Sequence, residues 1–375
     1  MATAYTPGLT VASRITHRVR RQLPIPGRVK VAEGEKVTDR DIVAETFMPG
    51  EITPVNVANL LALPPGDVVE CMLKNEGERV EASEPLAQTK GIFGLFKNTC
   101  HAKVSGTVET VSAVTGQVMI RGEPEPVRVQ AYLSGKVIEV LPDEGVVIEA
   151  EVSFIQGIFG VGGETYGRIV LACAEYDQEL SDDLIKPVMK DCIVIGGARM
   201  TEAAIRRAAD VGAAAIISGG IDDEDLKAFL GYDLGVAITG SEELGITVIV
   251  TEGFGEIAMA RRTFTLLASR EGADASVNGA TQIRAGVMRP EIIIPLTEKE
   301  KAEAPPSRLA DSELKLGRPV RIIRDPYFGL IGAVSALPPE LTTLESGSKA
   351  RVLEVKFDSG ESVVIPRANV ELIEG

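Results

Sequence analysis

The sequence predicts a multidomain β plus α/β protein with a duplicated β domain, a small mostly parallel α/β domain and a small C-terminal barrel. Hydrophobic residues make up 45% of the 375 residues but aromatic residues only 4%, so the cores must be aliphatic, which favours strands. Near residue 168 the apolar pattern changes from alternation to strands separated by helices. A charged, proline-containing segment then precedes a last group of short strands.

These changes divide the chain into five segments. The predicted order is a basic N-terminal arm (1–25), a β domain with internal repeats (26–167), an α/β domain (168–296), a linker (297–314) and a C-terminal barrel (315–375). A chain of this length has room for several domains, each with its own core.

The first 30 residues hold six basic side chains and no acidic one, whereas the chain has a net charge of −15, so the rest carries −21 (−15 less +6). This arm either docks on the chain's own acidic surface, on a protein partner or on RNA, or is only a partly ordered terminus, and these options stay open. It also resembles an organelle transit peptide, being rich in Arg and free of acids. The acidic remainder disfavours nucleic acid and anionic membranes, and no apolar run is long enough for a membrane span.

The β domain contains two pairs of repeated segments. Residues 33–46 and 76–89 share E-G-E-[K/R]-V, six residues and A-x-T, and residues 105–120 and 134–149 share S-G-x-V-x-x-V-x-x-x-x-G-x-V. Alternating Val predicts short half-buried strands, and Gly predicts the turns between them. One such unit cannot bury its apolar face alone, so we expect the copies to pack together.

The repeats resemble the barrel-sandwich hybrid of biotinyl and lipoyl carrier domains. They are similar above all to the noncatalytic versions in the C subunit of the Rnf electron-transport complex and the A subunit of the sodium-pumping NADH–quinone reductase. Carrier domains modify a hairpin lysine in a Met-Lys-Met or Asp-Lys-Ala context, which Lys90 and Lys97 lack. Because the cysteine runs of the Rnf clusters are absent too, the resemblance implies a fold rather than electron transfer. The matching residues are Gly77, Val80, Leu86, Ala87, His101, Ala102, Ser105, Gly106, Thr107 and Val108.

The tetrad Gly-Ile-Phe-Gly occurs twice, at 91–94 and at 157–160. The first copy replaces the tip of the carrier hairpin, and the second follows the last repeated strand. We expect the glycines to permit tight turns at related ends of the module. The apolar side chains between them form either a packed corner or a patch that docks a protein partner. These side chains are Ile92, Phe93, Ile158 and Phe159.

Strands and helices are predicted to alternate in the middle of the chain. Continuous apolar strands between helices indicate a mostly parallel sheet covered on both faces. The order of elements resembles the small regulatory domains called DRTGG, whose G-(I/V)-x-V-(I/L)-x-T strand corresponds to residues 245–251. The predicted strands are 168–174, 191–197, 213–220, 246–255 and 289–296, and the predicted helices are 200–212, 222–231 and 256–272.

Three of these strands end in glycine before a helix, which predicts a crevice at their carboxyl ends. Helix N-termini there offer N–H groups to an anion, so the loops are a candidate site for a small anionic ligand. In the alternative interpretation the glycines only shorten the turns. No loop matches a dinucleotide or P-loop motif. The candidate ligand-binding residues are Gly196, Gly197, Thr201, Gly219, Gly220, Gly253 and Gly255.

The C-terminal segment resembles the KOW motif of the NusG C-terminal domain and of several ribosomal proteins, which implies a five-stranded SH3-like barrel. That family binds proteins and RNA of the transcription and translation machinery through a glycine–aromatic turn. The resemblance makes Arg321, Arg324, Tyr327 and Phe328 candidates for partner contacts, and packing within the chain is the open alternative. The matching residues are Gly317, Val320, Arg321, Ile322, Pro326, Phe328, Gly329, Gly332 and Val334, with Asp325 where the family often has Gly.

No catalytic residue, metal ligand or cofactor is assigned. The only histidines are His17 and His101. The cysteines lack CxxC spacing, so we interpret the cysteines as reduced thiols of a cytoplasmic protein.

We therefore infer a nonenzymatic cytoplasmic adaptor or structural protein that docks partners through the KOW-like barrel and the Gly-Ile-Phe-Gly edges. Two alternatives are a regulator sensing a small anionic ligand at the glycine loops, and an accessory subunit or covalent carrier of an enzyme complex using Lys90. The oligomeric state stays open. The cysteines are Cys71, Cys100, Cys173 and Cys192.

Overall fold

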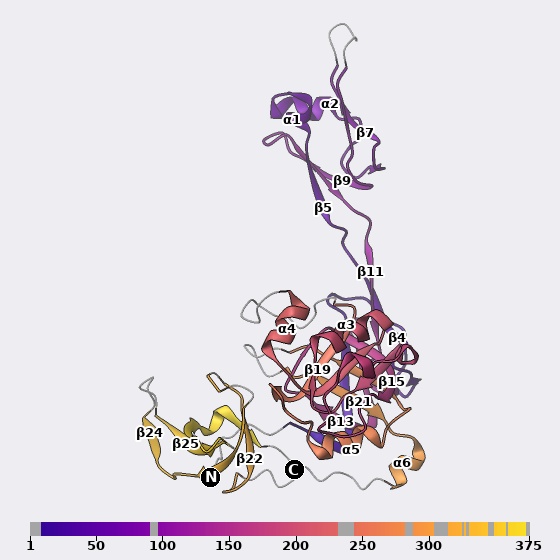
Figure 1. Ribbon diagram of the computed structural model, residues 1–375. Helices are drawn as coiled ribbons and strands as arrows, with labels where there is room; N and C mark the ends of the chain where they lie inside the picture. The colour runs from indigo at the N-terminus through magenta and orange to yellow at the C-terminus, as the bar shows by residue number, and fades with distance from the viewer. Residues whose placement is uncertain are drawn as a thin grey trace.

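Three parts make up the chain in the computed structural model: a body built on a large sheet, a lobe carried away from it by two strands, and a C-terminal sheet beside the body (Figure 1). Strands dominate all three. The described residues are 9–90, 97–231, 244–281, 288–303, 314–324, 326–327, 330–343, 349–357 and 359–372.

One twelve-stranded sheet forms the body, and it runs through both the predicted β domain and the predicted α/β domain. A boundary after residue 167 would cut β15 in two. The strands from β15 to β19 are parallel neighbours, and the rest of the sheet is antiparallel. Its order is β14 (Phe159–Val161), β19 (Thr247–Phe254), β18 (Ala215–Ile221), β16 (Cys192–Ile195), β15 (Glu164–Leu171), β20 (Asp274–Asn278), β21 (Glu291–Pro295), β13 (Gly145–Gln156), β12 (Gly135–Leu141) and β3 (Lys36–Val37), with β17 (Arg199–Met200) on β18.

The helices of the body follow the local signals of the sequence. Thr201 caps α3 (Glu202–Val211) by accepting a hydrogen bond from Ala204 N, and Gly212 ends it with a φ of 76°. α4 (Asp223–Leu230) begins with three acidic residues, which suit the helix dipole. α5 (Arg261–Ala268) is shorter than the predicted helix 256–272, and β20 was not predicted. Short 3-10 helices lie at Asp182–Leu184 and Pro187–Met189.

The basic N-terminal segment is a strand of the body. β1 (Val11–Gln22) pairs along the whole of β13, with a bulge after Ala12. Arg18 lies directly opposite Glu149, and their side chains are 2.6 Å apart. Arg14 and Arg21 also form ion pairs with carboxylates of the same chain. The described residues of this segment therefore dock on the chain's own acidic surface, which is one of the options that the sequence leaves open.

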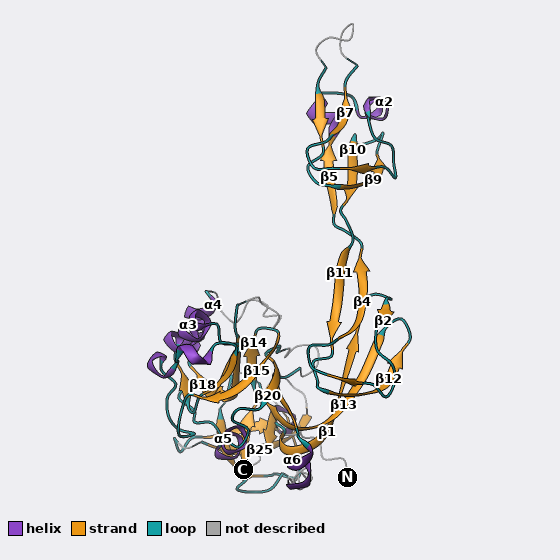
Figure 2. Cartoon of the chain, turned by 90° about the vertical axis from the view of Figure 1, so that its right-hand side faces the viewer, coloured by secondary structure: helices purple, strands orange, loops and turns teal. Residues whose placement is uncertain are grey.

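Two paired strands form a stalk between the body and the lobe, as Figure 2 shows. β4 (Ile42–Met48) pairs with β11 (Glu125–Gln130), and β2 (Arg28–Val29) lies on the other side of β4. The lobe buries its own apolar core, whose fully buried members all lie between Val55 and Ile120. Its elements are β5 (Ile52–Asn56), α1 (Val57–Leu61), a 3-10 turn (Pro65–Asp67), α2 (Val68–Cys71), β6 (Arg79–Val80), β7 (Pro85–Gln88), β8 (Thr99–His101), β9 (Gly106–Val111) and β10 (Gln117–Arg121).

The repeated sequences occupy equivalent positions in the body and in the lobe. In the body, Val37 of β3 pairs with Gly135 of β12. In the lobe, Val80 of β6 pairs with Gly106 of β9. Each glycine follows the Ser of its S-G motif, and each valine closes its E-G-E-[K/R]-V motif. The two pairs therefore have the same register, as two copies of one unit require.

The next strand pair repeats in the same way. Ala44 of β4 pairs with Val129 of β11, and Ala87 of β7 pairs with Cys100 of β8. Both ladders shift register at the neighbouring residue pair. The hairpin β7–β8 of the lobe thus corresponds to the stalk β4–β11 of the body. The lobe is a second copy of the unit, inserted where the first copy would have its hairpin tip.

The C-terminal part is a six-stranded antiparallel sheet with an aliphatic core of its own. α6 (Glu298–Glu303) lies in the predicted linker, and residues 304–313 are outside the described residues. The strands are β22 (Pro319–Ile322), β23 (Ile331–Ala336), β24 (Leu341–Thr343), β25 (Lys349–Lys356), β26 (Ser362–Pro366) and β27 (Val370–Leu372), with a 3-10 turn at Arg367–Asn369.

Candidate functional site

The glycine loops of the body pack closely against another part of the backbone. A Cβ on Gly219 would overlap Met259 N and Ile257 O, and one on Gly220 would overlap Gly255 O. The segment after Gly255 thus crosses the carboxyl ends of β18 and β19 before α5 begins. These glycines are needed for close backbone approach, and the chain itself fills the crevice in which we expected a ligand.

The N–H groups of these loops already donate to carbonyls of the chain. Gly219 N donates to Gly197 O and Ala198 O at 3.1 and 3.0 Å, and Gly255 N donates to Ile221 O at 2.8 Å. Four of the predicted ligand-binding residues therefore have no free donor for an anion. Thr201 is occupied as the cap of α3, and Gly253 of β19 lies opposite Gly220 in the parallel ladder. Those four residues are Gly196, Gly219, Gly220 and Gly255.

Arg321, predicted to contact a partner, lies between the C-terminal sheet and the body. It is 1% exposed, and its Nη2 donates to Glu252 Oε2 at the end of β19 at 2.6 Å. Its Nη1 donates to Glu371 Oε1 at 2.7 Å, and Glu371 also pairs with Arg289. Buried Arg321 and half-buried Arg289 therefore balance the two buried carboxylates. Arg321 therefore packs within the chain, which is the alternative to a partner contact.

The other contact candidates of the KOW-like segment lie in different surroundings. Arg324 is exposed, and half-buried Tyr327 packs on Phe357 with the ring centroids 6.1 Å apart. Phe328 lies outside the described residues. Among the described members of this set, Arg324 is the one with an exposed side chain.

The two Gly-Ile-Phe-Gly tetrads differ in what the structure says of them. Ile158 and Phe159 are 3% and 5% exposed, and Phe159 packs on Phe254 with the ring centroids 5.2 Å apart. The second tetrad is therefore a packed corner at β14. The first tetrad, with Ile92 and Phe93, lies outside the described residues.

The part of the lobe farther from the body exposes apolar side chains. Leu60 of α1, Val69 of α2 and Leu73, which follows α2, are 58%, 51% and 49% exposed. Figure 1 places α1 and α2 beside β7 in this half of the lobe. At the end of the hairpin, Lys90 Nζ lies 2.8 Å from Glu70 Oε2, and this hydrogen bond raises the pKa of Lys90. An exposed, paired and protonated lysine is a poor nucleophile.

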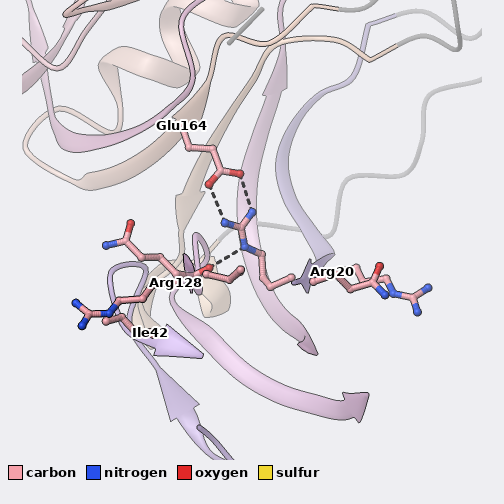
Figure 3. A pocket seen from close by; sticks show the side chains of 8 residues that line it. Arg20, Ile42, Arg128 and Glu164 are labelled. Atoms are coloured by element: carbon pink, nitrogen blue, oxygen red, sulfur yellow. Dashed lines mark hydrogen bonds and ion pairs between the residues drawn. The ribbon is translucent and has the colours of Figure 1, made fainter. Parts of the chain in front are cut away.

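A cavity of ≈ 610 Å³ lies between β1 and the stalk strand β11. Arg21 spans it, donating to both carboxylate oxygens of Glu164 at 2.6 and 2.8 Å and to Gln130 O at 2.7 Å. Arg20 and Arg128 also belong to its lining, and Figure 3 shows their side chains pointing away from each other. The lining thus carries three arginines against one carboxylate.

A second cavity, of ≈ 830 Å³, adjoins the first and shares Gln130 and Glu164 with it. Burial raises the pKa of Tyr166 in its wall to about 12, so this hydroxyl stays a donor at neutral pH. The Arg40 guanidinium lies over the Tyr166 ring, 5.7 Å from its centroid. Much of the remaining wall is small residues: Gly162, Gly163, Gly212, Ala213, Ala214 and Gly245.

No local pattern in the sequence predicts this pair of cavities. Their residues come from segments more than 100 positions apart, such as Arg20 and Arg128. The sequence carries only a local signal for a strand at each segment. Arg20 and Arg21 end a run in which basic and apolar residues alternate, and Arg128 lies between Val127 and Val129 in EPVRVQ.

Within the described ranges, no group of three or more His, Cys, Asp or Glu side chains is placed to hold a metal ion. No helix in the same ranges is long and apolar enough to cross a membrane. Models of known protein families and curated protein sequences give no match to this chain.

Proposed function

We propose that the chain is a nonenzymatic adaptor, in which the body carries the lobe as a docking module for a protein partner. The observation that carries this proposal is the nesting of the two copies. The inner copy has its own core, stands at the end of a two-stranded stalk, and replaces the hairpin tip of the outer copy. In the carrier domains that the repeats resemble, that exposed hairpin carries the lysine that is modified.

The surface of the lobe supports the same proposal. Leu60, Val69 and Leu73 expose apolar side chains in its outer half, and apolar residues rimmed by polar ones are typical of docking surfaces. Residues 91–96, between the two hairpin strands, read GIFGLF. The family resemblance adds a second contact through the KOW-like sheet, to a protein or RNA of the transcription or translation machinery. Of its candidate residues we assign this contact to Arg324, because Arg321 is occupied inside the chain.

Excision of the lobe tests the proposal with a folded control. Met48 and Glu125 are directly paired at the end of the stalk, so Asn-Gly in place of residues 49–124 would close β4 and β11 as a two-residue hairpin. The full chain, the excised body and the isolated lobe (49–124) are each used to capture proteins from native lysate, with and without nuclease. We expect the full chain and the isolated lobe to retain the same protein, and the excised body to lose it.

The result that contradicts the lobe as docking module is retention of the same partners by the excised body. If a variant with Arg324→Ala alone loses them, the KOW-like sheet is the docking element instead. A covalent carrier is excluded as long as the intact mass of the native protein shows no adduct on Lys90.

A further inference from the structure

The strand β1 forms an edge of the large sheet that is open along most of its length. β1 pairs with β13 on one side, and no strand of the described residues pairs with it on the other. The start of the strand lies beside α6, because Arg14 Nη1 donates to Lys301 O. From Thr16 to Gln22 the strand has neither a bulge nor a proline, two of the usual devices that protect a sheet edge. This segment is long enough to pair with a strand of ordinary length.

The ladder with β13 determines which backbone groups of the segment point outward. Leu23 N donates to Glu144 O at 2.8 Å, which makes Gln22 and Gly145 a pair without hydrogen bonds between them. Because the register is constant back to Ile15, alternate residues turn their N–H and C=O groups away from β13 as Gln22 does. None of these groups has a hydrogen-bond partner among the described residues. The residues with outward groups are Thr16, Arg18, Arg20 and Gln22, and all four are exposed.

The exposed face of this edge carries positive charge. The side chains of Arg18 and Arg20 are 66% and 58% exposed, and the segment contains no acidic residue. Arg18 uses its Nε for Glu149 Oε2, and neither of its Nη groups hydrogen-bonds a residue that the structure describes. Arg20 makes only an ion pair, with Glu144 Oε2 4.0 Å from its Nη2. Both guanidinium groups therefore keep donors for a further carboxylate on the outer side.

The other face of the same edge is apolar. Ile15 and Val19 pack partly buried against the core of the body, and the His17 ring stacks on Phe154. In a strand added at the edge, residues opposite the two arginines would lie on the exposed face, and the residues between them would lie beside Val19. A complementary strand therefore alternates acidic with apolar residues.

A second copy of β1 does not suit this edge. Antiparallel pairing of two such segments about Val19 would place Arg18 of one copy opposite Arg20 of the other, and like charges directly opposite each other are destabilising. We propose that β1 binds, by strand addition, an extended segment of a partner protein in which acidic and apolar residues alternate. The main-chain groups of the edge hold the segment, and Arg18 and Arg20 select its acidic residues. This surface is separate from the lobe, so it is a second docking surface of the chain.

Fluorescence anisotropy with the full chain tests this proposal. The probe is a labelled, end-capped peptide Thr-Val-Glu-Val-Glu-Val-Thr, which reads the same in both directions and so fits a parallel or an antiparallel strand. The double variant Arg18→Gln/Arg20→Gln should bind the peptide at least about tenfold more weakly. The control Arg207→Gln/Arg351→Gln removes the same charge at exposed positions elsewhere and should bind as the wild type does. Absence of peptide binding, equal losses in both double variants, or equal binding of a peptide with Lys in place of Glu would overturn the proposal.

Hydrogen exchange distinguishes strand addition from a contact of the side chains alone. The peptide should slow exchange of the outward N–H groups of Arg18 and Arg20, whereas those of Val19 and Arg21 already face β13 and should change little. Binding without protection of the outward groups would contradict strand addition. Protection that rises with protein concentration in the absence of peptide would assign the edge to a second copy of the chain, and would overturn the acidic partner.

Discussion

Nη2 of Arg321 and Oε2 of Glu252 lie 2.6 Å apart in a buried contact, although 69 positions of sequence separate the two residues. The pair joins β22 of the C-terminal sheet to the end of β19, at the carboxyl edge of the parallel strands. A charge buried there is stable only while its partner is present. The orientation of the C-terminal sheet on the body therefore depends on this pair and on Glu371.

Removal of Glu252 should strongly destabilise this contact. Glu252→Ala leaves the Arg321 guanidinium buried beside a single carboxylate that it shares with Arg289, and we expect a loss of about 3–5 kcal/mol in urea unfolding. The matched control is Glu256→Ala, since the Glu256 side chain is 79% exposed, and it should change the free energy of unfolding by less than about 0.5 kcal/mol. Equal effects of the two variants would show that the buried pair does not hold the contact.

The glycine loops should respond to substitution as packing does, independently of any ligand. Gly219→Ala places a Cβ against backbone atoms of Ile257 and Met259, which have little freedom to move, and should cost about 1–3 kcal/mol of folding free energy. Gly66→Ala is the control, because no atom lies within 4 Å of the added Cβ. Thermal unfolding of both variants measures the difference. A Gly219→Ala protein as stable as Gly66→Ala would contradict the filled crevice.

The two copies of the repeated unit should lose stability separately. Val37 and Val80 hold equivalent positions, and each is buried in its own copy. Val80→Ala should destabilise the lobe by about 2 kcal/mol, and Val37→Ala should destabilise the body by a similar amount. Hydrogen exchange resolves the two parts: Val80→Ala should speed exchange in β9 and β10 while β12 and β13 stay protected. Coupled loss of protection in both parts would contradict a lobe with an independent core.

Stability should fall on mild acidification partly because of His17. Its ring stacks on Phe154 with the centroids 4.7 Å apart, and burial lowers its pKa below 6.5. As pH falls through about 6.5, the unfolded chain gains a proton that the folded chain does not take up until the lower folded pKa, so unfolding becomes easier. His17→Phe should reduce this loss in urea unfolding between about pH 7.5 and 5.5. His101→Gln, at an exposed position, should not.

The repeats were predictable from the sequence because each copy carries its own turn glycines and alternating valines. The nesting of one copy inside the other was not predictable, because neither motif determines which E-G-E-[K/R]-V segment pairs with which S-G segment. Val37 pairs with Gly135, which follows it by almost 100 residues because the whole lobe lies between them in sequence. Val80 pairs with Gly106, which is much closer in sequence. Pairing at such a distance depends on the tertiary fold rather than on a local pattern.

The same limit explains the boundary and the N-terminal strand. β15 pairs with β16 on one side and with β20 on the other, so a change of periodicity near residue 168 marks a change of neighbours within one sheet. Arg18 alternates with Val19 and so carries a strand signal, but its acidic partner Glu149 is 131 positions away. The buried role of Arg321 is not predictable for a similar reason, because its carboxylate partners come from β19 and β27.

The adaptor account is tested most directly by site-specific photo-crosslinking in native lysate. The full chain carries a benzophenone amino acid either at Val69 on the lobe or at Val188 on the body, two exposed valines that are 51% and 80% accessible. The account predicts a discrete crosslinked protein at Val69 that disappears when unlabelled isolated lobe is added in excess, and no such product at Val188. A product at Val188 alone, or a Val69 product that excess lobe does not compete away, would contradict the lobe as the docking module.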